Sequence, residues 1–130
     1  MTDLEDILAS LWAQLPGCKV VAVADMDGLL VERHPSDAQA AELGSAPDEA
    51  ALEHVAADLT TVLTLVGGEM SRQLGAAVDE LVAVRASGGC RARRIDPELF
   101  LFVIVGASAD LGSVRREAAD VCGRLAGAFA

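Results

Sequence analysis

Seven consecutive apolar residues, Leu99 to Val105, stand between Pro97 and Gly106. A strand with one face in water alternates apolar and polar residues, and this run does not. Its β-branched and aromatic content favours a strand, and it is short for a helix. The run therefore predicts a central strand that is covered by helices on both faces.

The start of the chain has a helical period. Apolar residues recur at intervals of three and four up to Pro16-Gly17, which predicts an amphipathic helix. They are Leu4, Ile7, Leu8, Leu11, Trp12 and Leu15. Two short apolar runs follow, Val20 to Ala24 and Leu29 to Val31, on either side of Asp25-Met26-Asp27-Gly28. An Asp-Gly turn between two such runs predicts a β-hairpin.

A long helix is predicted after a polar segment. Residues 34 to 47 are rich in Pro, Ser, Asp, Ala, Gln and Glu without a sustained period, so we expect a mobile loop with room for one helical turn. Ser45-Ala46-Pro47-Asp48 has the spacing of a capping box and predicts the start of the helix. We expect Gly75 to end it. The predicted core stripe is Leu52, Val55, Ala56, Leu59, Val62, Leu63, Val66, Met70 and Leu74.

Beside that stripe, the long helix carries a face of small residues. At about 100° per residue, Thr60, Thr64, Gly67 and Ser71 fall within roughly 60° of one another. The adjacent glycines Gly67 and Gly68 cost about 2 kcal/mol relative to two alanines in a helix. One interpretation is that the glycines let the helix pack closely on the sheet. The other is that the same helix of a second subunit approaches them.

The rest of the pattern completes a single α/β (α+β) domain. Residues 81 to 86 and 90 to 95 are predicted strands around a Ser-Gly-Gly turn, and Asp96-Pro97-Glu98 turns the chain into the central strand. Residues 111 to 129 have a helical period, with Ser108 or Asp110 as the cap. The order of elements is α-β-β-α-β-β-β-α, which predicts a largely antiparallel sheet with helices on both faces.

Charge narrows the choice of partners. The net charge is −10, and residues 1 to 65 account for all of it, with 12 acids and 2 bases, whereas residues 66 to 130 hold 8 acids and 8 arginines. Such a surface repels nucleic acid and anionic membranes in spite of Arg91, Arg93 and Arg94. The N-terminus is acidic, and we expect a cytoplasmic protein without direct membrane insertion.

Metal or redox chemistry is not indicated. Cys18, Cys90 and Cys122 form an odd set without metal-ligand spacing, so we interpret them as small buried hydrophobes. His34 and His54 have no ligand partner at metal spacing and are predicted to be surface residues. The sequence predicts neither a cofactor nor a metal site.

One motif suggests an enzyme. Asp25-Met26-Asp27-Gly28 after an apolar strand resembles the nucleophile motif of haloacid-dehalogenase-type phosphatases. Those enzymes need a downstream lysine, and the only lysine here, Lys19, lies upstream. We therefore predict no catalytic residues, and we interpret Asp27 as a structural turn residue.

Several segments together resemble a known family. They are Leu15-Pro16-Gly17-Cys18 after the first helix, the V-V-A-V-A-D-x-D-G-L-L-V hairpin, the long Ala-rich helix, and Phe100 to Val105 followed by Ala109-Asp110-Leu111-Gly112-Ser113-Val114-Arg115. Over residues 4 to 129 the chain resembles the roadblock/dynein light chain family, and within it the bacterial MglB-type regulators of Ras-like GTPases. The acidic loop at residues 34 to 47 looks longer than is usual in that family.

The resemblance implies a profilin-like, three-layer fold. Its five-stranded antiparallel sheet would have the long helix on one face and the N- and C-terminal helices on the other. It also implies a homodimer that pairs through the third strand and the long helix, and a platform for a Ras-like small GTPase. We assign the dimer interface to Thr60, Thr64, Gly67, Ser71, Val82 and Val84, and partner binding to the helix face formed by His54, Asp58, Thr61, Leu65 and Arg72.

A small-molecule-sensing domain of the profilin or PAS-like type is the alternative. Such a sensor needs a cavity with convergent polar groups. The predicted core offers only aliphatic side chains, whereas Leu65 is an exposed apolar residue of the kind that an interaction module needs.

Overall fold

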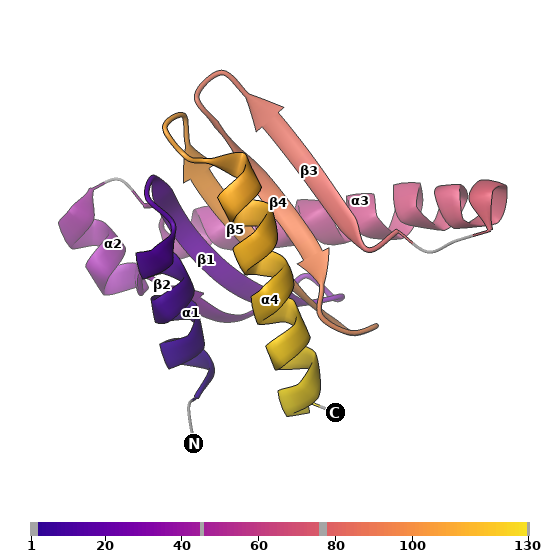
Figure 1. Ribbon diagram of the computed structural model, residues 1–130, viewed down its shortest axis with the longest axis horizontal. Coiled ribbons are helices and arrows are strands. Elements are labelled where there is room, and N and C mark those ends of the chain that lie inside the picture. Colours follow the sequence, from indigo (N-terminus) through magenta and orange to yellow (C-terminus); the bar gives the residue numbers. More distant parts are fainter. Residues whose placement is uncertain (1–2, 45, 76–77, 130) are drawn as a thin grey trace.

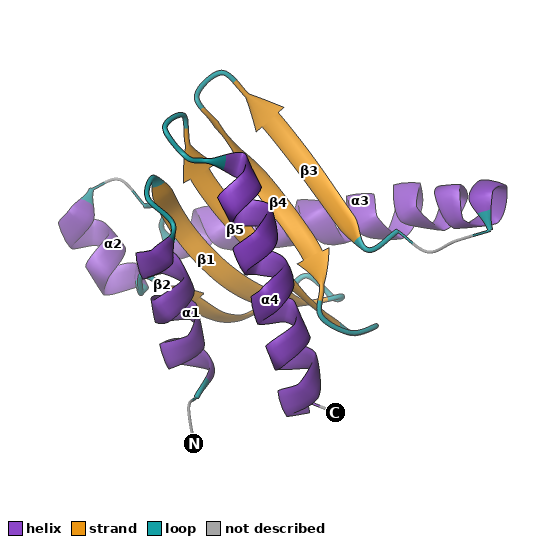
Figure 2. Ribbon diagram, in the orientation of Figure 1, coloured by secondary structure: helices purple, strands orange, loops and turns teal. Residues whose placement is uncertain are grey.

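The computed structural model describes residues 3–44, 46–75 and 78–129. Its elements are α1 (Leu4–Gln14), β1 (Cys18–Asp25), β2 (Leu30–His34), α2 (Asp37–Leu43), α3 (Glu49–Leu74), β3 (Glu80–Arg85), β4 (Gly88–Arg94), β5 (Leu99–Gly106) and α4 (Leu111–Phe129). Figure 1 shows them in chain order, and Figure 2 by type. The predicted fold class and order of elements are confirmed, and a short helix, α2, is added.

The sheet has five strands in the order β2-β1-β5-β4-β3. β5 lies at its centre and pairs antiparallel with β1 on one side and β4 on the other. Phe100, Phe102 and Val103 of β5 are fully buried, as the unbroken apolar run predicted. The two hairpins, β1–β2 and β3–β4, are therefore joined only through this last strand.

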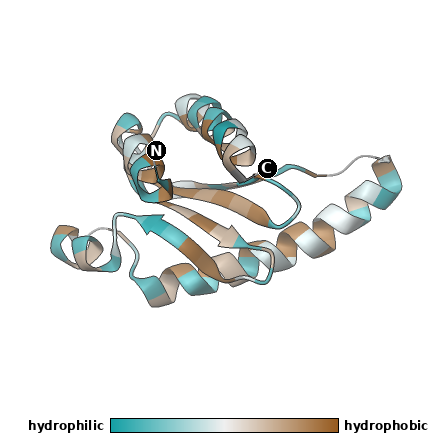
Figure 3. Ribbon diagram, turned by 90° about the horizontal axis from the view of Figure 1, so that it is seen from below, coloured by the Kyte–Doolittle hydropathy of each residue, from teal (hydrophilic) through white to brown (hydrophobic). Residues whose placement is uncertain are grey.

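Helices cover both faces of the sheet and form the predicted three layers (Figure 3). On one face, α1 and α4 pack against side chains such as Val21, Leu101 and Val103. On the other, α3 packs Leu52, Ala56 and Leu63 against Phe100 and Phe102 and their neighbours. The edge strands β2 and β3 each have one paired side.

The start of α3 differs from the prediction. Its N-cap is Asp48, whose carboxylate accepts a hydrogen bond from the Ala51 N–H at 2.9 Å. Ser45, the predicted cap, lies outside the described residues. A complete capping box occurs earlier, at Ser36 and Gln39, where it begins α2. The predicted loop therefore contains a helix of seven residues, because this local pair of side chains satisfies its first N–H groups.

The second half of α3 is less buried than its stripe predicted. The helix ends at Gly75 as expected, with a left-handed φ of 71°. Beyond Leu63, however, Val66, Met70 and Leu74 are exposed. The reason is visible in Figure 1, where α3 crosses beneath the sheet and continues past β3, the edge strand of the sheet. Periodicity predicted which side of the helix is apolar, but the sheet does not reach far enough to cover it.

Candidate interface

The C-terminal part of α3, residues 65 to 74, exposes several large apolar side chains, and we call it the projecting half of α3. Leu65 is 68% exposed, Val66 49% and Leu74 70%, with Met70 also exposed. Val66 and Met70 lie near the sheet-facing side, where they line a small cavity with Val62, Leu81 and Val78. Leu65 lies on the outer side of the helix. Apolar side chains grouped in this way are typical of interaction surfaces rather than of scattered surface residues.

Strand β3 adds a second apolar surface at the edge of the sheet. Val82 and Val84 are exposed and point to the α4 face, and Val84 is 64% exposed. Glu80 begins the strand in contact with Arg91 and with Arg93, so charge is paired at this end only. Because β3 pairs only with β4, its other edge has backbone groups without a strand partner.

The small-residue face lies against the chain itself. Gly67 is buried, and a Cβ placed on it would be 3.6 Å from the Cβ of Val78, in the segment that leads to β3. Thr64 is exposed, and Thr60 and Ser71 are half-buried. The close approach that the glycine allows is therefore made at least in part by a side chain of the same molecule.

The outer face of α3 carries the residues that we predicted to bind a partner. His54, Asp58, Thr61, Leu65 and Arg72 are all exposed, on the side of the helix away from the sheet. Arg72 forms an ion pair with Glu69 one turn back along the helix, and both side chains are mostly in water. The structure thus brings these five residues together as one accessible face with a single large apolar side chain.

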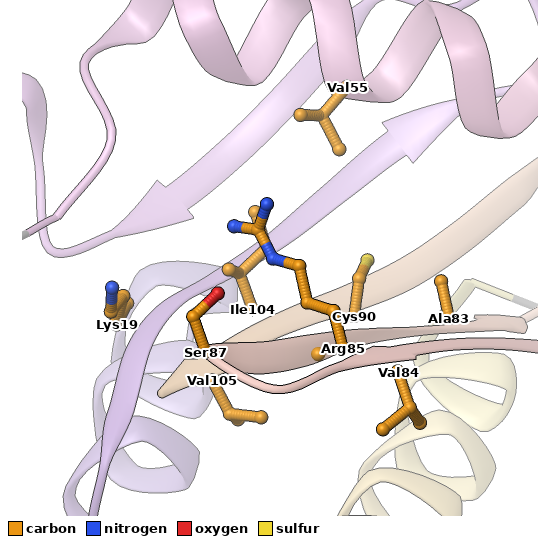
Figure 4. Close-up of a pocket in the computed structure, with 10 residues that line it drawn as sticks. Lys19, Val55, Ala83, Val84, Arg85, Ser87, Cys90, Ile104 and Val105 are labelled. Atoms are coloured by element: carbon orange, nitrogen blue, oxygen red, sulfur yellow. The ribbon is translucent and has the colours of Figure 1, made fainter. Parts of the chain in front are cut away.

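A pocket lies beside the first half of α3, at the end of the sheet where the β3–β4 hairpin turns (Figure 4). Its cavity of about 320 Å³ has Val55, Cys90 and Ile104 among its apolar walls. Lys19, Arg85 and Ser87 supply its polar groups. In Figure 4 the Arg85 guanidinium extends toward Val55 across the pocket, while Lys19 lies at one end. We call this site the Lys19/Arg85 pocket. The sequence analysis did not identify it, because its residues come from α3, from four strands and from the β3–β4 turn.

The D-x-D-G segment is a turn, and Asp25 rather than Asp27 holds it. The Asp25 carboxylate accepts hydrogen bonds from the N–H groups of Asp27 at 2.9 Å and Leu29 at 3.0 Å. Gly28 has a φ of 85°, and a Cβ there would be 3.2 Å from the Ala57 backbone of α3. A carboxylate engaged in this way is a structural one. The prediction that Asp27 is the structural residue of this turn is therefore wrong. The side chain of the first Asp, not the second, faces the returning backbone.

Cys122 is buried, as predicted, whereas Cys18 and Cys90 are only half-buried, because they lie near strand ends that the helices cover incompletely. Burial raises the pKa of Cys18 to about 12, that of Cys90 to about 11 and that of Cys122 to about 12. All three are free cysteines. Within residues 3–44, 46–75 and 78–129, no group of three or more His, Cys, Asp or Glu side chains is placed to hold a metal ion.

The two histidines differ in their surroundings. His54 is exposed, as predicted. His34 is half-buried, with its ring 5.2 Å from that of Trp12 in an edge-on contact, so the prediction of a surface residue is wrong for it. The physical reason is the register of β2, which pairs His34 with Val21 on the face that α1 covers.

Arg33 is a structural residue that the sequence did not reveal. It is only 5% exposed, and its guanidinium donates to the carbonyl of Pro35 at 2.7 Å and to that of Pro47 at 2.6 Å. The Asp37 carboxylate lies 3.9 Å away and also accepts a hydrogen bond from the Glu49 N–H at the start of α3. One buried side chain thus ties both ends of the α2 segment to the sheet.

These layers, with one long helix opposite two shorter ones across an antiparallel sheet, define the profilin-like class of α/β domains. No family model matches this chain, and no curated protein sequence matches it. Solved structures do. Profilin II from Acanthamoeba castellanii aligns at a TM-score of 0.67 with 11% identity, over 98% of this chain and 100% of that one.

The agreement is higher with two further solved structures. The Roadblock/LC7 domain from Streptomyces avermitilis aligns at a TM-score of 0.81 with 19% identity, over 98% of each chain. A structure described as MglB with tetrameric arrangement aligns at 0.78 with 17% identity, over 93% of this chain and 83% of that one. The chain therefore has the Roadblock/LC7 fold, and the resemblance found in the sequence is matched in three dimensions.

By length and composition alone, α3 could also cross a membrane. This criterion is weak, since the core helix of a soluble protein meets it too. Here the first half of α3 packs on the sheet through Leu52, Ala56 and Leu63.

Proposed function

We propose that this chain is a non-catalytic regulatory or scaffold protein of the cytoplasm that forms a homodimer and binds a Ras-like small GTPase, thereby modulating the nucleotide state or the location of that GTPase. The observation that carries the proposal is the projecting half of α3. Together with the open edge of β3, it presents an apolar surface that a monomer would leave in water. The MglB neighbour with a tetrameric arrangement supports self-association of this fold.

In the proposed dimer, the β3 strands of two copies pair edge to edge and the two α3 helices lie side by side. Val82 and Val84 then lie beside the partner's β3 strand on the α4 face of the joined sheet, and Val66 and Met70 leave water. Full burial of one such side chain is worth about 1.5–3 kcal/mol. Of the predicted small residues, Thr60, Thr64 and Ser71 stay at this helix interface in the proposal. Gly67 contributes less, since Val78 of the same chain already lies over it.

Light scattering at tens of micromolar protein tests the homodimer. The wild type should have the mass of two chains, and Val66→Asp, which places a charge in the buried seam, should have the mass of one. Thr61→Asp is the matched control, because it adds the same charge to the outer side of the same helix. A single-chain mass for the wild type would refute the dimer.

Partner binding belongs to the outer face of α3. Two copies would place two sets of His54, Asp58, Thr61, Leu65 and Arg72 on one broad platform. Leu65 is its apolar centre, and the exposed charges steer the encounter and set orientation. A regular helix keeps Arg72 at the rim of such a contact. We therefore propose that any effect on hydrolysis comes from differential affinity for the GTPase's own conformations.

A pull-down from native cytosol, scored for a nucleotide-binding partner, tests this second step. Leu65→Asp should abolish capture while leaving the dimer intact, and Val66→Asp should lose both. Capture of the same GTPase by Leu65→Asp at the wild-type level would show that the platform lies elsewhere.

The Lys19/Arg85 pocket favours a second candidate function, the small-molecule sensor. It supplies the cavity with convergent polar groups that the predicted core lacked, and its volume is near the lower end of the ligand-site range of about 300–1,000 Å³.

A further inference from the structure

Two cations distinguish the Lys19/Arg85 pocket in an acidic protein. The side chains that line it include no Asp or Glu. Among the residues that the structure describes, neither Lys19 nor Arg85 takes part in a recorded ion pair. In a chain of net charge −10, two cations that no neighbouring carboxylate neutralises create a local positive potential, which favours an anionic ligand.

Two glycines hollow the sheet between these cations. Arg85 of β3 pairs with Gly88 of β4, and Gly88 pairs with Gly106 of β5. Lys19 of β1 lies next to them, since a Cβ placed on Gly106 would be 3.6 Å from the Lys19 Cε. Positions without side chains therefore separate the two cations, as is typical where a ligand approaches a strand closely.

The inner wall of the pocket is apolar and incompletely covered. Val55 of α3, Cys90 of β4 and Ile104 of β5 pack against the core, yet each is only half-buried. In Figure 4, Val55 lies on the α3 side of the pocket, and Cys90 and Ile104 lie on the strands opposite it. An apolar ligand tail between the helix and these strands would remove this surface from water.

The polar groups form the outer rim. Lys19, Arg85 and Ser87 are all exposed. In the view of Figure 4, the Ser87 hydroxyl lies between the Lys19 ammonium and the Arg85 guanidinium. A polar rim with two cations, and an apolar wall farther in, fit a ligand that has an anionic head and an apolar tail.

We propose that the Lys19/Arg85 pocket binds a small monocarboxylic acid with an apolar tail. The Arg85 guanidinium takes the carboxylate, because its planar fork matches the two oxygens of that group. Ser87 adds a hydroxyl donor, and Lys19 adds a second positive charge. The inference rests on the second candidate function, the sensor, whose ligand class it names, and it does not depend on the homodimer.

The volume of the pocket sets the length of the tail. A cavity of about 320 Å³ holds about ten non-hydrogen atoms, if each takes the ~30 Å³ that a water molecule occupies in the liquid. Octanoate has about this size. Affinity should rise by about fourfold for each methylene group from acetate to octanoate, and it should level off for longer acids.

Calorimetric titration of the wild-type protein with matched ligands tests the ligand class. Octanoate should bind saturably, with one site per chain. Acetate has the head without the tail, and octylammonium has the tail with the opposite charge, so neither should saturate. Octan-1-ol lacks the charge and should bind about fivefold more weakly than octanoate, as expected for the loss of an exposed ion pair. Equal affinity for the alcohol and the acid would show that the cations take no part and would overturn the inference.

Variants of the two cations test their role. Arg85→Gln and Lys19→Gln should each weaken octanoate binding by about fivefold, and an unchanged affinity for octan-1-ol would verify that the pocket is intact. Arg124→Gln is the matched control, because it removes the same charge from an exposed position on α4, the helix on the opposite face of the sheet. It should bind octanoate as the wild type does. Wild-type affinity in both pocket variants would contradict the proposal.

Methyl NMR locates the ligand by an independent signal. The chain has three isoleucines, Ile7, Ile95 and Ile104, and of these Ile104 lines the pocket. Octanoate should shift the δ1-methyl signal of Ile104. It should leave those of Ile7 and Ile95 unchanged, since both belong to the core on the opposite face of the sheet. A shift of Ile7 or Ile95 without one of Ile104 would place the ligand elsewhere and overturn the inference.

The outcomes separate this inference from the functions proposed above. A wild type that binds octanoate but has the mass of one chain in light scattering would refute the homodimer and support the inference. Saturable binding of octylammonium in place of octanoate would keep the sensor and overturn the assignment of a carboxylic acid. A wild type that binds none of these ligands would overturn the inference, whereas the homodimer and its GTPase platform would stand.

Discussion

At the scale of single residues, two charged side chains, the half-buried Asp25 and the buried Arg33, hold the β1–β2 turn and the α2 segment in place. Asp25 closes the β1–β2 turn, and Arg33 fastens the α2 segment through the carbonyls of Pro35 and Pro47. Neither residue touches the proposed interface, so both can be altered without changing it.

Asp25→Ala should lower the free energy of unfolding by about 1–2 kcal/mol, because two backbone N–H groups lose their acceptor. Asp27→Ala should change it by less than about 0.5 kcal/mol, since its side chain is exposed. Urea unfolding of both variants beside the wild type measures the difference. Equal losses for the two would contradict the roles assigned here.

The cysteines give a prediction about pH. Their pKa values are raised in the folded protein, so the neutral thiols stabilise the fold below the ordinary thiol pKa of 9.0, and this contribution is lost as the pH rises toward 11 to 12. Folded protein at pH 8 should react with a thiol reagent far more slowly than protein in 6 M guanidinium, a denaturing concentration. Fast modification of all three thiols in the folded state would contradict these raised pKa values and the burial of Cys122.

At the scale of elements, α3 is the decisive helix, because one half completes the core and the other half leaves it. Its adjacent glycines were given two interpretations, close packing of the helix on the sheet and the approach of a second subunit. Gly68 has no atom within 4 Å of the position that a Cβ would take, and Gly67 has only Val78.

Gly68→Ala should therefore stabilise the chain by about 0.5–1 kcal/mol through helix propensity. Its effect on the mass in light scattering identifies what approaches the helix. An unchanged dimer means that no second backbone lies against Gly68, whereas loss of the dimer would support the interpretation in which a second subunit approaches there.

The elements also show what a single sequence can and cannot predict here. β5 was predictable because seven apolar residues in a row allow few other structures, and Gly75 because a glycine after a helical period is a strong stop. The exposure of Met70 and Leu74 was not, since periodicity carries no information about how far a sheet extends. The Lys19/Arg85 pocket was hidden for a related reason, since its cations are 66 positions apart in the numbering and meet only through β-sheet pairing.

At the scale of the whole molecule, the proposed dimer couples folding to association. If the projecting half of α3 is covered only in the dimer, the unfolding temperature should rise with protein concentration, because mass action favours the associated state. Val66→Asp should unfold at a lower temperature that does not depend on concentration. Differential scanning fluorimetry over a hundredfold range of concentration, about 1 to 100 μM, is sufficient to see the trend. A wild type whose unfolding temperature is constant over that range would speak against the coupling.

The central position of β5 has a consequence for the chain as it is synthesised. Both hairpins and two of the three sheet-covering helices precede β5 in the sequence, yet β1 and β4 have no common neighbour until β5 is inserted between them. The nascent chain therefore cannot close its core before Gly106 has left the ribosome, and until then the apolar side of α3 lacks Phe100 and Phe102 as its cover. Folding is delayed until β5 has been synthesised, so a ribosome that stalls before β5 would hold a chain with exposed strands, open to proteases and to aggregation.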